Sequence, residues 1–222
     1  MRYTLSRLAD VVQDTLYILR TTGWPAAVRS LTRRIGQLFF STVEFAVLAR
    51  SLDEPIGCSE PRASVEVRQG IPQDMPRIGN LVSPSYRKRH EQLFARDDSI
   101  CFVATHEQEI VAWCWVSKEF VHRAPLQLAL TEGYVHGVYT VPGYRRLGIQ
   151  AVLLAHCAAW AHEQGHRRLI ALVNVGNGAS RGMFSKAGYR QIGQLNRSHI
   201  LWWYRFRQKP TDNAVSSGST GD

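Results

Sequence analysis

The sequence of 222 residues has no long apolar run, no closely spaced cysteine pair and no long block of basic residues. Nothing approaches the ~18 consecutive apolar residues that a membrane-spanning helix needs, so we expect no such helix. The four cysteines lack the short spacing of metal ligands, which predicts no metal site and four reduced, mostly buried thiols. They are Cys58, Cys101, Cys114 and Cys157. Reduced thiols favour a cytoplasmic protein.

Acidic residues are also scarce, because 18 Asp and Glu stand against 27 Lys and Arg, a net charge of +9. A basic balance suits an anionic partner: a phosphorylated cofactor, a nucleic acid or an anionic lipid surface. The basic residues are spread along the chain, so we rank nucleic acid last. Asp10 and Asp14 interrupt the first apolar residues, and we therefore expect no secretory signal.

Residues 1–61 are predicted to be an N-terminal helical extension and a connecting segment. Apolar residues recur at helical spacing over 3–20, and Pro25 suits the first turn of a second, basic amphipathic helix. This helix either lies on a membrane, giving peripheral contact through residues 1–40, or packs on its own domain with a solvated polar face. Packing on the domain is the more ordinary case. Residues 43–48 are a candidate strand, and 53–57 read as a turn.

Residues 62–208 are predicted to form the main domain, in the order β, α, β-β-β, α, β, α, β-β. The expected strands cover 65–68, 99–104, 109–116, 134–141, 169–173, 189–192 and 200–206. The expected helices cover 73–95 with a break near Ser83, 146–164, and a short stretch from Asn177 to Lys186, and residues 119–129 are an expected loop. This order is typical of an α+β (mixed α/β) domain whose sheet packs against helices. Residues 209–222 are predicted to be a disordered tail.

A strand, a tight basic turn and a helix follow one another over residues 138–150. Arg145, Arg146 and Gly148 lie where the N-terminus of that helix should form. Such an end exposes backbone N–H groups and carries partial positive charge, and glycine lets a bulky anion approach. The turn therefore predicts a pyrophosphate site. A structural glycine beside solvated arginines would give the same pattern, so the spacing alone leaves both interpretations open.

The run VPGYRRLGIQ, residues 141–150, resembles the acyl-CoA signature Arg/Gln-x-x-Gly-x-Gly/Ala of the GNAT superfamily of N-acyltransferases. Arg145 and Gly148 match this signature, whereas Gln150 replaces the small last residue. A second run, VNVGNGASRGMFSKAGYRQIG, resembles the family pattern Asn-x-x-Ala…Leu-Tyr-x-Lys-x-Gly-Phe, with Ser180 for Ala and Phe184 for Tyr. The two blocks stand in the family's order and spacing.

The resemblance implies a GNAT-like fold, with a central, mostly antiparallel sheet whose middle strands splay apart, flanked by helices. Acetyl-CoA or another acyl-CoA would enter the wedge as co-substrate. Backbone groups of Val138, Tyr139 and Thr140 would bind the pantetheine arm. The turn and helix start would hold the pyrophosphate, and Asn177 and Phe184 would complete the site. The turn residues are Arg145, Arg146, Leu147, Gly148, Ile149, Gln150 and Ala151. A main-chain site tolerates Gln150 if its side chain points outward, since it would otherwise crowd this site.

The implied reaction is direct transfer of an acetyl or other acyl group to an amine, which makes the chain an N-acetyltransferase or related N-acyltransferase. The acceptor would be a small-molecule amine or a protein amine. An ammonium must lose a proton before it attacks, and His136 on the central strand is the candidate base. Glu132 is a weaker candidate. Many relatives have a tyrosine acid where Phe184 stands, and Phe has no O–H. The alternative is therefore a non-catalytic acyl-CoA-binding or regulatory module, attached to a membrane through the N-terminal helices.

Overall fold

The computed structural model describes residues 12–13, 15–21, 23–25, 28, 40–53, 61–119, 128–200 and 203–210. Within the N-terminal extension, residues 15–21 and 24–25 are helical, as the spacing predicts. The rest of the two expected N-terminal helices lies largely outside the described residues. So do most of the expected turn at 53–57, most of the loop at 119–129 and the tail beyond residue 210. In the described ranges, no helix has the length and apolarity that crossing a membrane requires.

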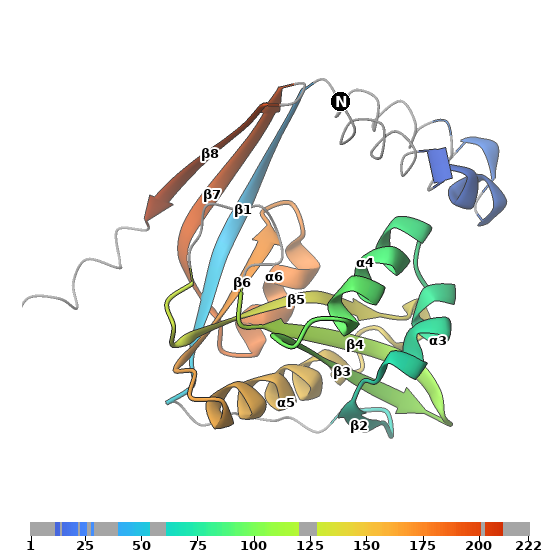
Figure 1. Ribbon diagram of the computed structural model, residues 1–222, viewed down its shortest axis with the longest axis horizontal. Helices are drawn as coiled ribbons and strands as arrows, with labels where there is room; N and C mark the ends of the chain where they lie inside the picture. Colours follow the sequence, from blue (N-terminus) through green and yellow to red (C-terminus); the bar gives the residue numbers. More distant parts are fainter. Residues whose placement is uncertain are drawn as a thin grey trace, which may run out of the picture. The chain divides into compact units, whose positions relative to one another are not determined.

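Eight strands of the described residues form one sheet, in the order β2-β3-β4-β5-β6-β1-β7-β8 (Figure 1). Among the pairings whose register is described, only β5 with β6 is parallel and the others are antiparallel. The predicted class, a mixed α+β fold with a mostly antiparallel sheet, is confirmed. The strands are β1 Phe40–Ser51, β2 Glu66–Gln69, β3 Ser99–His106, β4 Glu109–Ser117, β5 Glu132–Thr140, β6 Arg168–Asn174, β7 Arg190–Ile200 and β8 Trp203–Pro210.

Strand β1 lies within the predicted N-terminal extension but belongs to the sheet. It pairs with β6 from Phe45 opposite Asn174 to Ser51 opposite Arg168, which confirms the candidate strand at 43–48. The extension is therefore not only helical, and residue 62 does not separate it from the sheet. At the other end β8 runs to Pro210, so Lys209 and Pro210 belong to a strand rather than to the predicted tail.

The chain divides into two compact units, and the larger comprises Glu44–Gly70, Asp97–Asn196 and Phe206–Asp222. In this unit α5, Ile149–Glu163, packs along β3, β4 and β5 (Figure 1). Its buried face carries Leu153, Leu154, Cys157, Ala158 and Ala161, which join the main core. On the opposite side of the helix, His156 and Ala159 are exposed. Helix α6, Gly178–Lys186, follows β6 as predicted.

The other unit comprises Met1–Val43, Ile71–Arg96 and Arg197–Arg205. Its helical segment consists of the 3-10 turn Pro72–Asp74, α3 Met75–Asn80 and α4 Pro84–Phe94. The break before Pro84 was predicted, and it occurs because proline suits a first helical turn but not a helix interior. The Asp74 carboxylate accepts a hydrogen bond from the Ile71 N–H at 2.9 Å, which caps the start of the segment.

Candidate active site

The two central strands of the sheet, β5 and β6, separate halfway along β5. They pair from Glu132 opposite Arg168 to Val135 opposite Ala171. Beyond that point the described pairing of β5 is with β4, through His136 to Thr140, and that of β6 is with β1. The middle strands therefore splay as the family resemblance implies. Backbone groups that a continuous sheet would use are left for another partner along residues 136–140.

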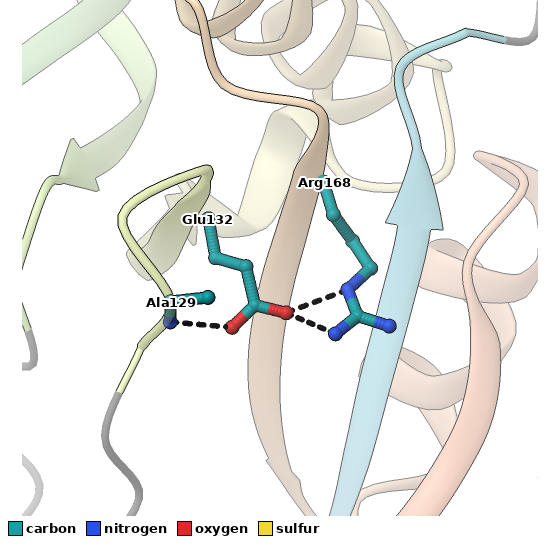
Figure 2. A network of polar contacts seen from close by, with 3 residues as sticks. All are labelled: Ala129, Glu132 and Arg168. Atoms are coloured by element: carbon teal, nitrogen blue, oxygen red, sulfur yellow. Dashed lines mark hydrogen bonds and ion pairs between the residues drawn. The ribbon is translucent and has the colours of Figure 1, made fainter.

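The closed end of this wedge is tied by a buried carboxylate (Figure 2). One oxygen of Glu132 accepts from Arg168 Nε at 2.6 Å and from the neighbouring terminal nitrogen, while the other accepts from the Ala129 N–H at 3.0 Å. The Glu132 side chain is only 9% exposed, whereas that of Arg168 is half exposed. Glu132 thus joins β5, β6 and the preceding loop at the paired end, away from the opening.

A bulge marks the point where β5 leaves β6. The pairs Trp113 with Tyr139 and Trp115 with His136 leave one extra residue on β5. Gly137 lies there with φ +59°, and an added Cβ would lie 2.9 Å from Trp115 Cδ1. Only glycine fits both conditions, and such a bulge redirects the strand that follows it. Gly137 was not among the predicted site residues, although a lone glycine inside a strand pattern is a bulge signal.

The candidate base His136 is buried immediately before this bulge, with 6% exposure. Its Nε2 lies 2.8 Å from Ser117 Oγ, a partner that the sequence did not indicate. Tyr134 stacks on the imidazole at a centroid distance of 5.1 Å, and Trp115 at 6.4 Å. The ring is therefore held in one orientation at the start of the splayed segment.

The basic turn before α5 contains two residues in the left-handed region. Arg146 has φ +66°, and Gly148, the residue before the helix, has φ +83°. Helix α5 consequently begins at Ile149, three residues later than predicted. Such turns direct successive backbone N–H groups into an anion-binding concavity, which adds to the positive end of the helix.

Two hydrogen bonds fix the turn against its surroundings. Arg145 Nε donates to the Thr140 carbonyl at 3.1 Å, and the Arg62 N–H donates to the Leu147 carbonyl at 2.9 Å. Leu147 packs against the core and Ile149 is buried, whereas Arg145, Arg146 and Gly148 are exposed. Apolar residues anchor the turn while its charged residues and glycine face solvent.

The Gln150 side chain turns back toward the sheet. Its Nε2 donates to the Tyr139 carbonyl at 2.6 Å and to Thr140 Oγ1 at 2.9 Å, with a longer contact of 3.4 Å to the Trp113 carbonyl. The side chain reaches back from α5 to the end of β5, where that strand has left β6 and pairs with β4. It thereby links the two segments that were predicted to bind the two parts of CoA, and it keeps clear of the first-turn backbone.

Asn177 and Phe184 both have structural roles here. Asn177 Oδ1 accepts from the Ser180 N–H at 3.1 Å and caps α6, as predicted. Phe184 is 4% exposed and packs edge-to-face on Tyr189 at 4.9 Å. Neither observation tests their expected contacts with CoA.

The tyrosines that could replace the missing acid are all engaged in packing. Tyr139 stacks on Trp113 at 4.5 Å, and Tyr144 lies 5.5 Å from the His106 ring. Tyr189 is buried in the core, and this burial raises the pKa of its phenol well above its ordinary value. A raised pKa keeps the proton on the oxygen, and the side chain is only 4% exposed.

The described thiols are buried as predicted. Cys101, Cys114 and Cys157 are free and inside the core, and Cys58 lies outside the described residues. Burial, followed by the neighbouring Cys114, raises the pKa of Cys157. Within the described ranges, no three His, Cys, Asp or Glu side chains gather as metal ligands would.

The model of the acetyltransferase (GNAT) family matches residues 69–189, more than half of the chain. The chain belongs to this family. The match spans β3 to α6 with both sequence blocks, so the resemblance seen in the sequence is confirmed. A comparison with curated proteins finds no match.

Solved structures with the same fold share little sequence with this member of the GNAT family. A functionally unknown conserved protein from Staphylococcus epidermidis is 15% identical over 82% of this chain and 67% of its own, with a TM-score of 0.55. The GNAT domain of S. lividans PAT is 21% identical over 66% and 97%, at 0.51. The aminoglycoside acetyltransferase AAC(6')-Iy, bound to the bisubstrate analog CoA-S-monomethyl-acetylneamine, is 15% identical over 65% and 99%, at 0.51. These likenesses establish the fold.

Proposed function

We propose that this chain transfers an acetyl or another acyl group from CoA directly to an amine. The observation that carries the proposal is the opening of β5 from β6 after Val135, with the left-handed turn at Arg146 and Gly148 close by in sequence. A splayed strand offers backbone donors and acceptors to an extended amide chain, and the turn offers N–H groups to phosphates. CoA contains both groups, because its pantetheine arm is an extended amide chain and its pyrophosphate is the anion.

In this proposal the backbone of Val138, Tyr139 and Thr140 binds the pantetheine arm and polarises the thioester carbonyl. Backbone N–H groups over residues 146–151 hold the pyrophosphate, with charge from Arg145 and Arg146. Gln150 fixes the distance between the two segments, because its amide bonds Tyr139 and Thr140. Asn177 and Phe184 complete the site at the pantetheine end. The net charge of +9 favours approach of the anionic co-substrate.

The chemistry needs a proton acceptor, an oxyanion donor and a leaving group. His136 takes a proton from the substrate ammonium, and the neutral amine then attacks the thioester carbonyl carbon. A backbone N–H of the splayed strand stabilises the oxyanion, the C–S bond breaks, and CoA leaves as a thiolate. A simple thiol has a pKa near ~8.5, so departure without a general acid is feasible. This accounts for Phe184 in a working enzyme.

The competing function is acyl-CoA binding without transfer. One observation favours it: Phe184 occupies the family's acid position and is buried in the core, without a hydroxyl. Release of CoA in the presence of a panel of small amines, amino sugars and amine-bearing peptides separates the two functions. Steady CoA release with one class supports transfer. Tight binding without CoA release from any acceptor supports the binding module.

Calorimetric titration with acetyl-CoA tests the proposed site, and α5 itself offers a matched pair of variants. Gly148 and Gly165 flank its two ends with φ +83° and +82°, so alanine strains both positions about equally. Gly148→Ala should weaken binding by at least about tenfold, since about 1.4 kcal/mol of misplaced backbone contacts suffices. Gly165→Ala should leave the affinity unchanged. Equal effects of the two variants would contradict the proposed pyrophosphate site.

Contact with a membrane surface through residues 1–40 is a separate proposal. Apolar side chains in the described part of this segment are exposed, among them Val12 at 54%, Leu16 at 49% and Trp24 at 69%. Together with its basic residues, this suits an anionic bilayer surface. Co-sedimentation with anionic vesicles tests it. A variant without residues 1–39 keeps β1 in the sheet and should lose lipid binding; unchanged binding would refute the proposal.

A further inference from the structure

Four polar side chains form a continuous hydrogen-bonded chain across three neighbouring strands. His136 on β5 contacts Ser117 Oγ on β4 at 2.8 Å, and Ser117 Oγ lies 2.7 Å from Ser99 Oγ on β3. Ser99 Oγ then donates to Asp98 Oδ1 at 3.1 Å. The sheet register places Ser99 directly opposite Ser117. These contacts lie on the face opposite α5, because Cys114 and Val116, which alternate with Trp115 and Ser117, join the α5 core.

Along this hydrogen-bonded chain, the side chains at the His136 end are buried and those at the Asp98 end are partly exposed. His136 is 6% exposed and Ser117 is fully buried, whereas Ser99 and Asp98 are half-buried. The chain thus leads from the start of the splayed segment of β5 to a carboxylate with access to solvent. The Ser117 hydroxyl already satisfies Nε2 of His136, and two further hydrogen bonds continue beyond it to Ser99 and Asp98.

The carboxylate fixes the direction of every hydrogen bond in the chain. An ionised carboxylate can only accept hydrogen bonds. The Ser99 hydroxyl must therefore donate its single hydrogen to Asp98. Ser117 must then donate to Ser99, and its own oxygen must accept from His136 Nε2. His136 is therefore the Nε2–H tautomer when neutral, which puts the basic lone pair of the imidazole on Nδ1. This assignment follows from proton counting and not from the pKa of any group.

We propose that Ser117, Ser99 and Asp98 are positioning residues that set the His136 tautomer and carry its proton to the surface, an inference that rests on the proposed acyl transfer. Nδ1 accepts one proton from the substrate ammonium. The Nε2 proton passes to Ser117, the Ser117 proton to Ser99, and the Ser99 proton to the Asp98 carboxylate. One proton enters and one reaches Asp98, while each hydroxyl loses one and gains one. The ring is left neutral as the Nδ1–H tautomer. The first tautomer returns when Nδ1 gives its proton to water after product release and the Asp98 proton travels back through Ser99 and Ser117 to Nε2.

The tautomer is measurable without turnover, by 15N NMR of the full chain labelled at histidine. The His136 signals are identified by their loss in His136→Gln. The wild type should show a protonated Nε2 and an unprotonated Nδ1. Ser99→Ala and Asp98→Ala free the Ser117 hydroxyl to reverse, so Nδ1–H should become populated. Ser99→Thr, which keeps the hydroxyl, should restore the wild-type spectrum, and the exposed neighbour Asp97→Ala should not change it.

Kinetics with an accepted amine supply the second test. Ser99→Ala and Asp98→Ala should lower kcat/KM by about tenfold, part of the 10²–10⁴ that a positioned general base contributes. Ser99→Thr and Asp97→Ala should stay near wild type, and the affinity for acetyl-CoA should not change in any of them. A wild-type Nδ1–H tautomer, or a Ser99→Ala variant with unchanged tautomer and rate, would overturn the relay. If the wild type transfers to no amine, the proposed function fails, and the NMR result alone decides the tautomer.

Discussion

Over residues 132–135, β5 pairs with β6, from Tyr134 also with β4, and is tied by Glu132 to Arg168 and Ala129, whereas from His136 onward it loses β6 and acquires a bulge at Gly137. The paired half carries the groups that hold the sheet together. The splayed half carries His136 and the backbone proposed to meet the thioester. One strand therefore separates stability from chemistry along its length. Substitutions in the paired half should lower stability, and substitutions in the splayed half should lower activity.

His136→Gln should have the largest effect, and on the splayed half alone. The glutamine amide can still donate to Ser117, but it has no basic lone pair at neutral pH. We expect kcat/KM to fall by about 10²–10⁴-fold, the usual contribution of general-base catalysis, with little change in unfolding free energy. Steady-state kinetics and urea unfolding check both parts. A rate within twofold of wild type would remove His136 from the mechanism.

Gly137→Ala should affect both halves, because the residue lies where they meet. Its φ of +59° and the 2.9 Å approach to Trp115 predict a loss of about 1–3 kcal/mol in unfolding free energy. A shifted bulge should also weaken acetyl-CoA binding. Gly143→Ala is the control, since nothing lies within 4 Å of its added Cβ. Equal stabilities of the two variants in urea unfolding would show that the bulge geometry is not required.

Glu132→Gln should weaken the paired half alone. Removing the charge leaves Arg168 able to turn to solvent, so the expected loss is about 1–2 kcal/mol, the scale of a charge-assisted hydrogen bond in a partly buried site. The rate per folded molecule should be unchanged. Glu91→Gln is the matched control, because its pair with Arg87 is about half exposed on both sides and contributes at most a few tenths of a kcal/mol. A kinetic defect in Glu132→Gln at unchanged stability would contradict the separation.

His166 makes the unfolding free energy of the paired half depend on pH, and we expect this effect to be smaller than that of Glu132→Gln. It is buried near Gly133, and burial, then the charge of Lys118, lowers the pKa of its imidazole below the ordinary 6.5. The unfolded chain takes up this proton first, so stability is full above pH 6.5 and falls as pH drops through 6.5 toward the lower folded pKa. His166→Phe should flatten that part of the profile measured by urea unfolding. His162→Gln, exposed on α5, should keep it.

Periodicity and two sequence blocks predicted the strand and helix order, the Asn177 cap and the family. These features depend on local pattern, such as the apolar runs of β3 and β4 or the proline that starts α4. The splay of β5 from β6 came from the family resemblance, not from the pattern. Domain limits, the acceptor and the individual site residues stay predictions.

Contacts between distant segments were not readable from the sequence. Nothing in the sequence joins Ser99, Ser117 and His136, because their proximity depends on the register of three strands. The contacts of Gln150 were not predicted for the same reason: its partners Tyr139 and Trp113 lie on β5 and β4, far from it in sequence. The start of α5 was misplaced because a left-handed Arg146 has no sequence signal comparable to that of glycine.

Amide hydrogen exchange with and without acetyl-CoA tests the central claim most directly, because it reports on the two halves of β5 in one experiment. We predict slower exchange over residues 138–140 and 146–151 in the presence of acetyl-CoA, with no change over residues 132–135. Free CoA lacks only the acetyl group and should protect the same segments. Absence of protection, or protection confined to the paired half, would contradict the claim that the opening of β5 from β6 is the acyl-CoA site.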